Sequence, residues 1–379
     1  MNRKTEEGAI HDERGNAMNN DRLWLQNIIR YGSIFLIPLL FLSRPVLGDE
    51  ISEEFSRIVP LGEGGRVVLE TLGGSVVFSG TDETDVEIEA TIVVKAKNEE
   101  RGREILSDMR IDVDGGANKV KIETIYPKKE GGFFAKIFGS CCYKDVRVNY
   151  RLKVPRNIDL SIDGTSTDIV GDDVEGRVKC DITSGDVDLQ RIGGSVYVDG
   201  TSGNVKVVDI GGDLVVDNTS GEVRGSGVAG DVEIDNTSGT VNLQDLGEDF
   251  YLDGTSCDVN LEHVAGDVET DVTSGGVKII GLGGGILHDG TSGDVEVHFA
   301  EKLLNSCNIG TTSGDVSITV AEESGMNIVL NTASGAISAR LPSMEIVELS
   351  RDNLNARVMG GGVEVRVETT SGDIHIGLR

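Results

Sequence analysis

Apolar and polar residues alternate in short runs that recur between residues 158 and 340. The run from Val232 to Asp235, for example, reads valine, glutamate, isoleucine, aspartate. A period of two places successive side chains on opposite faces of a strand, so each run predicts a β-strand with one buried face. Corners that contain glycine, such as Ala229-Gly230, separate the runs. The pattern therefore predicts many short strands that are joined by tight corners, without helices between them.

The runs and corners repeat every 18 residues, and a Thr-Ser-Gly type of corner marks each repeat. A fixed period of this length is typical of a solenoid in which each repeat is one coil. Each strand should pair in parallel with its counterpart in the next coil, about 4.8 Å away. We expect an all-β fold, a parallel β-helix of about eleven coils, wound right-handed as parallel crossovers prefer. The anchoring threonines are Thr165, Thr183, Thr201, Thr219, Thr237, Thr255, Thr273 and Thr291, with looser copies at Thr312, Ser334 and Thr370.

The chain divides into four expected regions: an N-terminal segment 1–48, a β-rich cap region 49–157, the solenoid repeats 158–340, and a closing coil at 341–379. The cap region lacks the 18-residue register and should cover the open end of the solenoid. Its pattern predicts strands at 67–69, 75–78, 86–94 and 146–154, a short helix at 98–109, and a hairpin from 111–113 and 120–125.

The N-terminal segment has the features of a secretory signal peptide. The 13 residues from Tyr31 to Ser43 are apolar, Arg22 and Arg30 precede them, and small residues before Asp49 suit cleavage. A membrane span needs about 20 apolar residues, so this run is short for one. The segment predicts export to the periplasm, the cell envelope or the medium. An uncleaved anchor, which would associate the chain with a membrane, is the alternative.

Charge excludes two classes of partner. The chain holds 64 acidic and 35 basic side chains, a net charge of −29. Such a chain repels nucleic acid and anionic lipid surfaces, so neither is expected as a partner. The same excess leaves room for divalent cations, although a solvated acidic surface explains it equally well.

The five cysteines do not form a recognisable framework. Their odd number and their spacing predict neither a zinc site nor a set of disulfides. Cys180 falls in a core position, Cys257 replaces a turn glycine, and Cys307 lies in a longer spacing. Cys141 and Cys142 are adjacent. An exposed cysteine could remain free or link two chains.

Three features together resemble a known family. They are the segment Tyr150–Pro155, the Thr-Ser-Gly-Asp-Val series, and the ending Val365–Ile376. They are similar to the putative-adhesin β-solenoid family of bacterial cell-envelope proteins, a domain of unknown function. The resemblance covers nearly all of the chain after residue 48. It implies an extracytoplasmic protein, and it brings no catalytic residues with it.

An aspartate stands two residues before each of the eight strict anchors. Stacked coils would place these carboxylates in a row, about 4.8 Å apart, where like charges repel. We expect each aspartate to accept hydrogen bonds from the backbone of its own turn, as in an Asx-turn. A ladder of calcium sites is the alternative, because carboxylates are hard oxygen ligands. The residues are Asp163, Asp181, Asp199, Asp217, Asp235, Asp253, Asp271 and Asp289.

Other candidates favour structural interpretations. A second, interrupted row that includes Asp168 and Asp186 fits a solvated edge, and the outward row with Asp188, Lys206 and Arg224 has ordinary mixed charge. Adjacent threonine and serine in a corner do not form the flat threonine array of an ice-binding face. His288 falls in a core position. A short apolar insert packs over the open end of the solenoid or forms a docking patch; it holds Phe133, Phe134, Ile137 and Phe138.

The sequence thus predicts a non-enzymatic, adhesin-like binding or structural scaffold with a protein or glycan ligand and no cofactor. The alternative is a carbohydrate-active β-helix enzyme of the polysaccharide lyase or hydrolase type. Such an enzyme should have a groove with clustered arginine, lysine and aspartate on one face of the solenoid. Neither the ligand nor the oligomeric state follows from the sequence.

Overall fold

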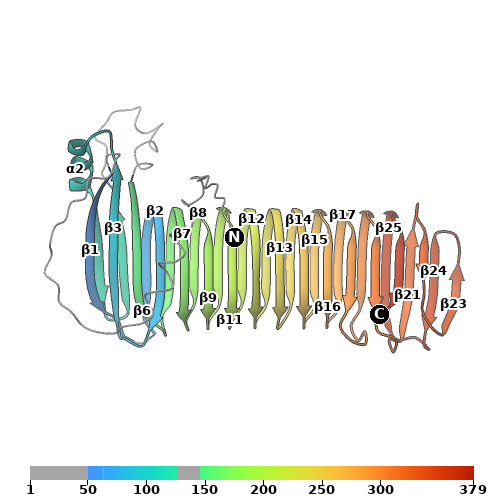
Figure 1. Cartoon of the computed structure of the whole chain (residues 1–379). Coiled ribbons are helices and arrows are strands. Elements are labelled where there is room, and N and C mark those ends of the chain that lie inside the picture. The colour runs from blue at the N-terminus through green and yellow to red at the C-terminus, as the bar shows by residue number, and fades with distance from the viewer. Residues whose placement is uncertain (1–49, 63, 127–145) are drawn as a thin grey trace, which may run out of the picture. The chain divides into compact units, whose positions relative to one another are not determined.

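The computed structural model describes residues 50–62, 64–126 and 146–379, and in these ranges the chain is all-β apart from one helix. The expected signal segment 1–48, the pair Cys141 and Cys142, and the apolar insert with Phe133 lie outside the described residues. In the part that is described, no helix is long and apolar enough to cross a membrane. The strands stack in series, which gives the solenoid-like arrangement in Figure 1.

Each coil contributes one strand before its Thr-Ser-Gly corner and one after it, so the stack has two rows of strands. Strands of the first row are β8 (Val178–Ser184), β10 (Val196–Ser202), β15 (Val268–Ser274), β17 (Ile286–Ser292) and β19 (Cys307–Ser313). Strands of the second row are β9 (Val187–Ile192), β11 (Val205–Ile210), β16 (Val277–Leu282), β18 (Val295–Phe299) and β20 (Val316–Val320). Four longer strands run through the corner into both rows: β7 (Asp159–Val174), β12 (Leu214–Val228), β13 (Val232–Leu246) and β14 (Phe250–Val264).

The pairing between coils is parallel and follows the repeat. Val232 on β13 lies opposite Leu214 on β12 and opposite Phe250 on β14. The inward side chains of both rows form one continuous hydrophobic core, in which Val232 and Phe250 are each 1% exposed. Since each coil has neighbours only above and below, its stability depends on those two contacts.

The N-terminal region contains β1 (Glu50–Pro60), β2 (Arg66–Thr81), β3 (Asp85–Lys95), α2 (Glu99–Asp108), β4 (Arg110–Gly116), β5 (Lys119–Ile125) and β6 (Val146–Pro155). The predicted helix and the β4–β5 hairpin are confirmed, and the Asn98 side chain caps α2 by accepting from the Arg101 backbone N–H. The sequence did not reveal that β2 is itself a coil of the stack, paired in parallel with β7 along its length. It also did not reveal the edge strand β1.

The C-terminal region differs from the closing coil that we expected at 341–379. It contains β21 (Met326–Thr332), β22 (Ile337–Ala339), β23 (Met344–Leu349), β24 (Asn353–Val358), β25 (Val363–Ser371) and β26 (Ile374–Leu378). The last coil, β25 and β26, does not close the end of the stack. It lies between the coil of β19 and β20 and the coil of β21 and β22, while the antiparallel strands β24 and β23 form the end (Figure 1).

Candidate functional site

The eight aspartates of the predicted ladder form an unbroken row on the outer face of the first row of strands. Each lies opposite the next in register, from Asp163 and Asp181 on β7 and β8 to Asp271 and Asp289 on β15 and β17. All eight are exposed. Glu70 on β2 lies opposite Asp163 and extends the row by one acid. We call these nine residues the acidic ladder.

The expected Asx-turns are not found. Across residues 146–379, no hydrogen bond joins the side chain of any of the eight ladder aspartates to another group. These residues stand within strands, so their side chains point straight out of the sheet while the backbone N–H groups around them bond to neighbouring strands. The turn-capping role that we assigned to them therefore belongs to other residues.

Two other rows of acids cap the corners. The Asp186 backbone N–H donates to Asp168 Oδ1 at 3.1 Å, and the Asn204 N–H donates to Asp186 Oδ1 at 2.8 Å. Near the opposite corner the Asp249 N–H donates to Asp231 Oδ1 at 3.2 Å. Each acid thus satisfies a backbone donor of the next coil. The row with Asp168 and Asp186, which we expected to be only a solvated edge, links coils together.

The ladder carries the electrostatic signature of like charges in a row. Partial burial and then the carboxylates of Asp217 and Asp253 raise the pKa of Asp235 above its usual range. Partial burial and then the carboxylate of Asp181 raise the pKa of Asp163. No cation of the protein compensates the centre of the row, since none of the salt bridges among the described residues reaches it.

The ladder has polar and aromatic neighbours on the same flat face. The anchoring threonines, also exposed, flank it on one side. On its other side runs a row that includes Tyr197, Tyr251 and Leu287, which are 36%, 41% and 45% exposed. This strip offers a carboxylate and a hydroxyl group from each of the eight coils, and aromatic rings at Tyr197 and Tyr251. Among the described residues no group of three or more His, Cys, Asp or Glu side chains is arranged to hold a metal ion, and the calcium ladder stays a prediction.

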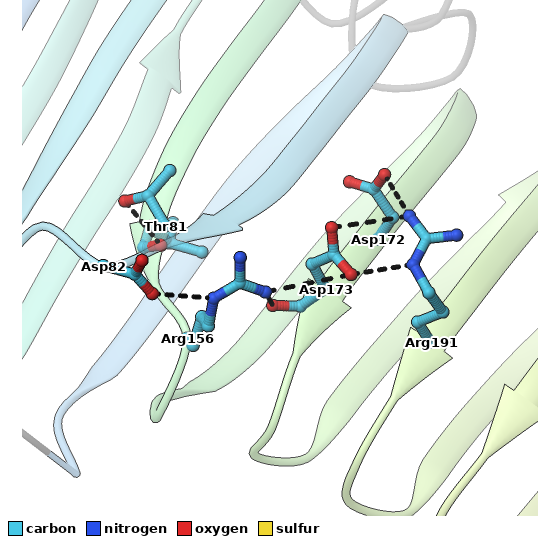
Figure 2. Close-up of polar contacts among 7 residues, drawn as sticks. Thr81, Asp82, Arg156, Asp172, Asp173 and Arg191 are labelled. Atoms are coloured by element: carbon cyan, nitrogen blue, oxygen red, sulfur yellow. Dashed lines mark hydrogen bonds and ion pairs between the residues drawn. The ribbon is translucent and has the colours of Figure 1, made fainter. Parts of the chain in front are cut away.

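A second candidate site is a shallow groove of about 400 Å³. It runs along the corners where the chain leaves the second row of strands and enters the next coil. Figure 2 shows the ion pairs at its rim. Arg156 Nε donates to Asp82 Oδ1 at 3.0 Å, which ties the loop after β2 to the first coils. Arg191 Nε donates to Asp173 Oδ1 at 2.7 Å, and Arg191 Nη2 donates to Asp172 Oδ2 at 2.9 Å.

Two adjacent carboxyl groups beside the groove, those of Asp172 and Asp173, have pKa values shifted in opposite directions. The hydrogen bond from Arg191 lowers the pKa of Asp173, while partial burial and the Asp173 charge raise the pKa of Asp172. Enzymes use such separated pairs for general acid–base work. Both Asp173 (φ 60°) and Arg191 (φ 53°) also have left-handed backbones, which non-glycine residues seldom adopt. No motif in the sequence points to this cluster.

The outward row that we judged ordinary remains so. Lys206 Nζ lies 2.8 Å from Asp188 Oδ2, and Arg224 Nη1 lies 2.6 Å from Glu222 Oε2. Each cation pairs with its own neighbour, and none of these four residues lines the groove. They therefore do not add to the cluster of arginines and aspartates there.

Polar and sulfur-containing residues in the core have structural environments. His288 is buried, as predicted, and its Nδ1 lies 2.8 Å from Thr270 Oγ1; burial lowers its pKa to about 4. Cys180, Cys257 and Cys307 are buried and free, and burial raises their pKa values to about 12, 11 and 12. Thiols of this kind are unreactive at neutral pH.

Comparison with known proteins gives one family. A family model described as Toastrack DUF4097 matches residues 213–377, and no curated protein matches the chain. The chain is also similar to three crystal structures. A putative cell adhesion protein from Clostridium sporogenes is 12% identical, with a TM-score of 0.21 and coverage of 87% of this chain and 100% of that one. A putative adhesin from Bacteroides fragilis is 14% identical, with a TM-score of 0.28 and coverage of 86% and 97%.

The third similar structure is a lipid binding protein, also called putative, from Parabacteroides distasonis. It is 12% identical, with a TM-score of 0.28 and coverage of 86% of this chain and 96% of that one. Identities this low carry no information on ligands. The family match agrees with the family that the Thr-Ser-Gly repeats led us to expect. Residues 213–377 of the chain are therefore similar to the Toastrack DUF4097 family.

Proposed function

We propose that this protein is a non-enzymatic, adhesin-like scaffold that binds a protein or glycan outside the cytoplasm. The observation that supports this most is the acidic ladder. The side chains of its eight aspartates make no hydrogen bond to other described residues, so the carboxylate oxygens remain available to accept hydrogen bonds from a ligand. A fold that needed these carboxylates would have used them in its turns.

Repetition makes the face suited to extended ligands. An outward aspartate and an outward threonine recur at each of the eight coils, about 4.8 Å apart. A chain of sugar or peptide units laid along the stack can meet several weak sites at once, and linked weak sites bind far more tightly than one alone. Tyr197 and Tyr251 add aromatic surface, which contributes apolar contact area beside the polar rows.

We also propose details of the winding of the coils and the location of the protein. We infer a right-handed winding, an 18-residue repeat throughout the regular coils, and about eleven coils. We infer export from the predicted signal segment 1–48, which would bring the ladder outside the cytoplasm. Fractionation of cells that produce the full chain, followed by N-terminal sequencing of the exported form, tests the location and whether cleavage precedes Asp49.

The binding test compares two triple variants of the exported chain. Asp217→Asn, Asp235→Asn and Asp253→Asn remove three charges from the centre of the ladder. Glu248→Gln, Glu262→Gln and Glu301→Gln remove three charges from exposed positions away from it. This second set is the matched control, because it changes the net charge equally.

Each variant is applied to immobilised polysaccharides and to intact bacterial cells. We expect the wild type and the control to bind at least one of these surfaces. The ladder variant should bind that surface at least about tenfold more weakly, which corresponds to about 1.4 kcal/mol. Equal binding by both variants, or no binding by the wild type, would contradict the proposal.

A carbohydrate-active enzyme remains the second candidate, and the observation that favours it is the groove lined by Asp173 and Arg191, with Asp172 paired to Arg191 beside it. Its carboxyl groups have separated pKa values, although ion pairs already occupy both arginines at its rim. Incubation of the purified chain with the same polysaccharides, followed by analysis of reducing ends and unsaturated products, distinguishes the two. Products that appear with the wild type and disappear with Asp172→Asn would favour the enzyme.

A further inference from the structure

The last coil of the chain occupies a slot between two coils that precede it in the sequence. β25 pairs in parallel with β19 on one side and with β21 on the other. β26 pairs in the same way with β20 and β22. Only residues 321–325 connect β20 to β21, yet a whole coil lies between them.

The slot is built to receive a coil on both edges. Asp373, in the corner of the inserted coil, donates its backbone N–H to Asp315 Oδ1 at 2.8 Å. Its own Oδ1 accepts from the Ala336 backbone N–H at 2.8 Å. The inward residues Val365 and Ile374 are fully buried. Without the inserted coil, the two walls would expose core side chains and two unpaired strand edges.

The inserted coil is made after both walls of the slot, because it follows them in the sequence. Because the walls of the slot precede it in the sequence, they can form before residues 363–378 are available. An open slot with two free edges is then a receptor for any strand pair with the right pattern of buried residues.

A short hinge leads into the inserted coil. Residues 359–362 join β24 to β25, and three of them turn with positive φ: Met359 at 53°, Gly360 at 87° and Gly361 at 89°. Met359 is 45% exposed and makes this turn without the freedom of a glycine. Extending the hinge would release Met359 from its left-handed conformation and let four residues span about 14 Å.

We propose that the coil of β25 and β26 inserts into the slot of a second copy of this chain as well as into its own. Two copies that exchange their last coils form a closed dimer in which each slot remains filled. The exchange uses the same strand pairs and the same buried residues as the single chain, so it costs little beyond association. A slot with two strand edges and a glycine-containing hinge together allow it.

Cysteine pairs across the slot test the exchange. Ser313 on β19 and Ser371 on β25 are direct partners in register and both are exposed. Full chains with Ser313→Cys alone and Ser371→Cys alone, each with a different tag, are produced in the same cells and purified through both tags. Linked heterodimer beyond the level of a control pair with the same native cysteines shows that β25 of one chain lies beside β19 of the other. The double variant in one chain shows that the positions can form the bond.

The matched control is Ser184→Cys and Ser202→Cys, which are also direct partners but on β8 and β10 in the regular part of the stack. We expect the slot pair to give at least tenfold more linked heterodimer on non-reducing gels than this control pair. If the double variant closes its bond within one chain while the mixed slot pair gives no more heterodimer than the control pair, the proposal is wrong.

Shortening the hinge gives an independent measurement. Deletion of Gly360 and Gly361 leaves only two residues to cross from one side of β21 to the other and removes two positive-φ glycines, which strains the return into the same slot. We therefore expect the dimer fraction in light scattering to rise at least fivefold over the wild type. Deletion of Glu301 and Lys302, in the connection between β18 and β19, is the control and should leave the fraction unchanged. A folded hinge variant that stays monomeric would contradict the proposal, and if it fails to fold, the cysteine pairs decide.

Discussion

Asp217 on β12 and Asp235 on β13 lie directly opposite each other, and neither carboxylate bonds to any other described residue. Two like charges in this arrangement cost free energy rather than supply it. The same relationship continues along the row, because Asp253 lies opposite Asp235 on the other side. The fold thus tolerates the ladder and does not depend on it, which is why we assign the ladder to binding.

The corner acids should behave in the opposite way. Asp231 accepts a hydrogen bond from the backbone N–H of Asp249 in the next coil. We predict that Asp231→Ala lowers the free energy of unfolding by about 1 kcal/mol, because a backbone donor loses its partner. Chemical denaturation followed by circular dichroism measures this, with Glu233→Ala on the exposed strand face as the control. Equal midpoints for the two variants would contradict the capping role.

The buried pair of Thr270 and His288 predicts a pH effect. Burial lowers the folded-state pKa of His288 to about 4, below its usual 6.5, so the unfolded chain binds the proton more tightly. The contribution of this residue to stability is full above pH 6.5 and is lost as the pH falls towards 4. A shift of this size is worth on the order of 3 kcal/mol.

The double variant Thr270→Val and His288→Val removes this titration and places residue types that other coils use at the same position. We expect its melting temperature to fall less than that of the wild type between pH 7 and pH 4.5. The carboxyl groups with raised pKa values stabilise the fold as the pH falls, and they do so equally in both proteins. The difference between the two curves of melting temperature against pH therefore isolates His288. Parallel curves would show that His288 does not titrate in this way.

A charge inside the core should disrupt more than one coil. Val232 is 1% exposed and lies between Leu214 and Phe250. We predict that Val232→Asp costs more than about 4 kcal/mol, because it buries a charge without a partner. The exposed neighbour Glu233→Asp is the control. An unchanged melt for Val232→Asp would mean that the assignment of this position to the core is wrong.

Much of the fold could be predicted because the signals are local. Period-two alternation and the corner residues place every strand from β7 to β20 within a few residues. The position of β25 could not be predicted, because its pairing with β19 joins residues 58 positions apart in the sequence, such as Cys307 and Val365. The coil formed by β2 was missed since Thr71-Leu72-Gly73-Gly74 departs from the Thr-Ser-Gly corner.

The site was predicted in part. The sequence correctly places the eight aspartates in a row, yet it suggests the wrong hydrogen bonds for them. The distinction depends on direction: a side chain in mid-strand points away from the sheet, whereas Asp168 in a corner can reach the next coil. The spacing of residues along a chain does not contain that information. The Arg191 cluster was missed for a similar reason, because Asp82 and Arg156 are far apart in sequence.

The calcium alternative makes a distinct prediction. If the ladder binds no calcium, millimolar calcium leaves the melting temperature unchanged. If it binds calcium, a concentration one hundred times the dissociation constant stabilises the fold by about 2.7 kcal/mol. Differential scanning calorimetry with calcium, with magnesium and with chelator checks this. We expect no change, and a rise with calcium that the chelator reverses would make the eight aspartates a metal site.

The melting temperature of the ladder variant Asp217→Asn, Asp235→Asn and Asp253→Asn tests the central claim most directly. The claim is that the fold leaves these carboxylates free for a ligand, so their removal relieves repulsion and loses no internal hydrogen bond. We predict a free energy of unfolding equal to that of the wild type or higher by up to about 1 kcal/mol. A melting temperature several degrees lower would show that the fold already uses the ladder, and would contradict the account.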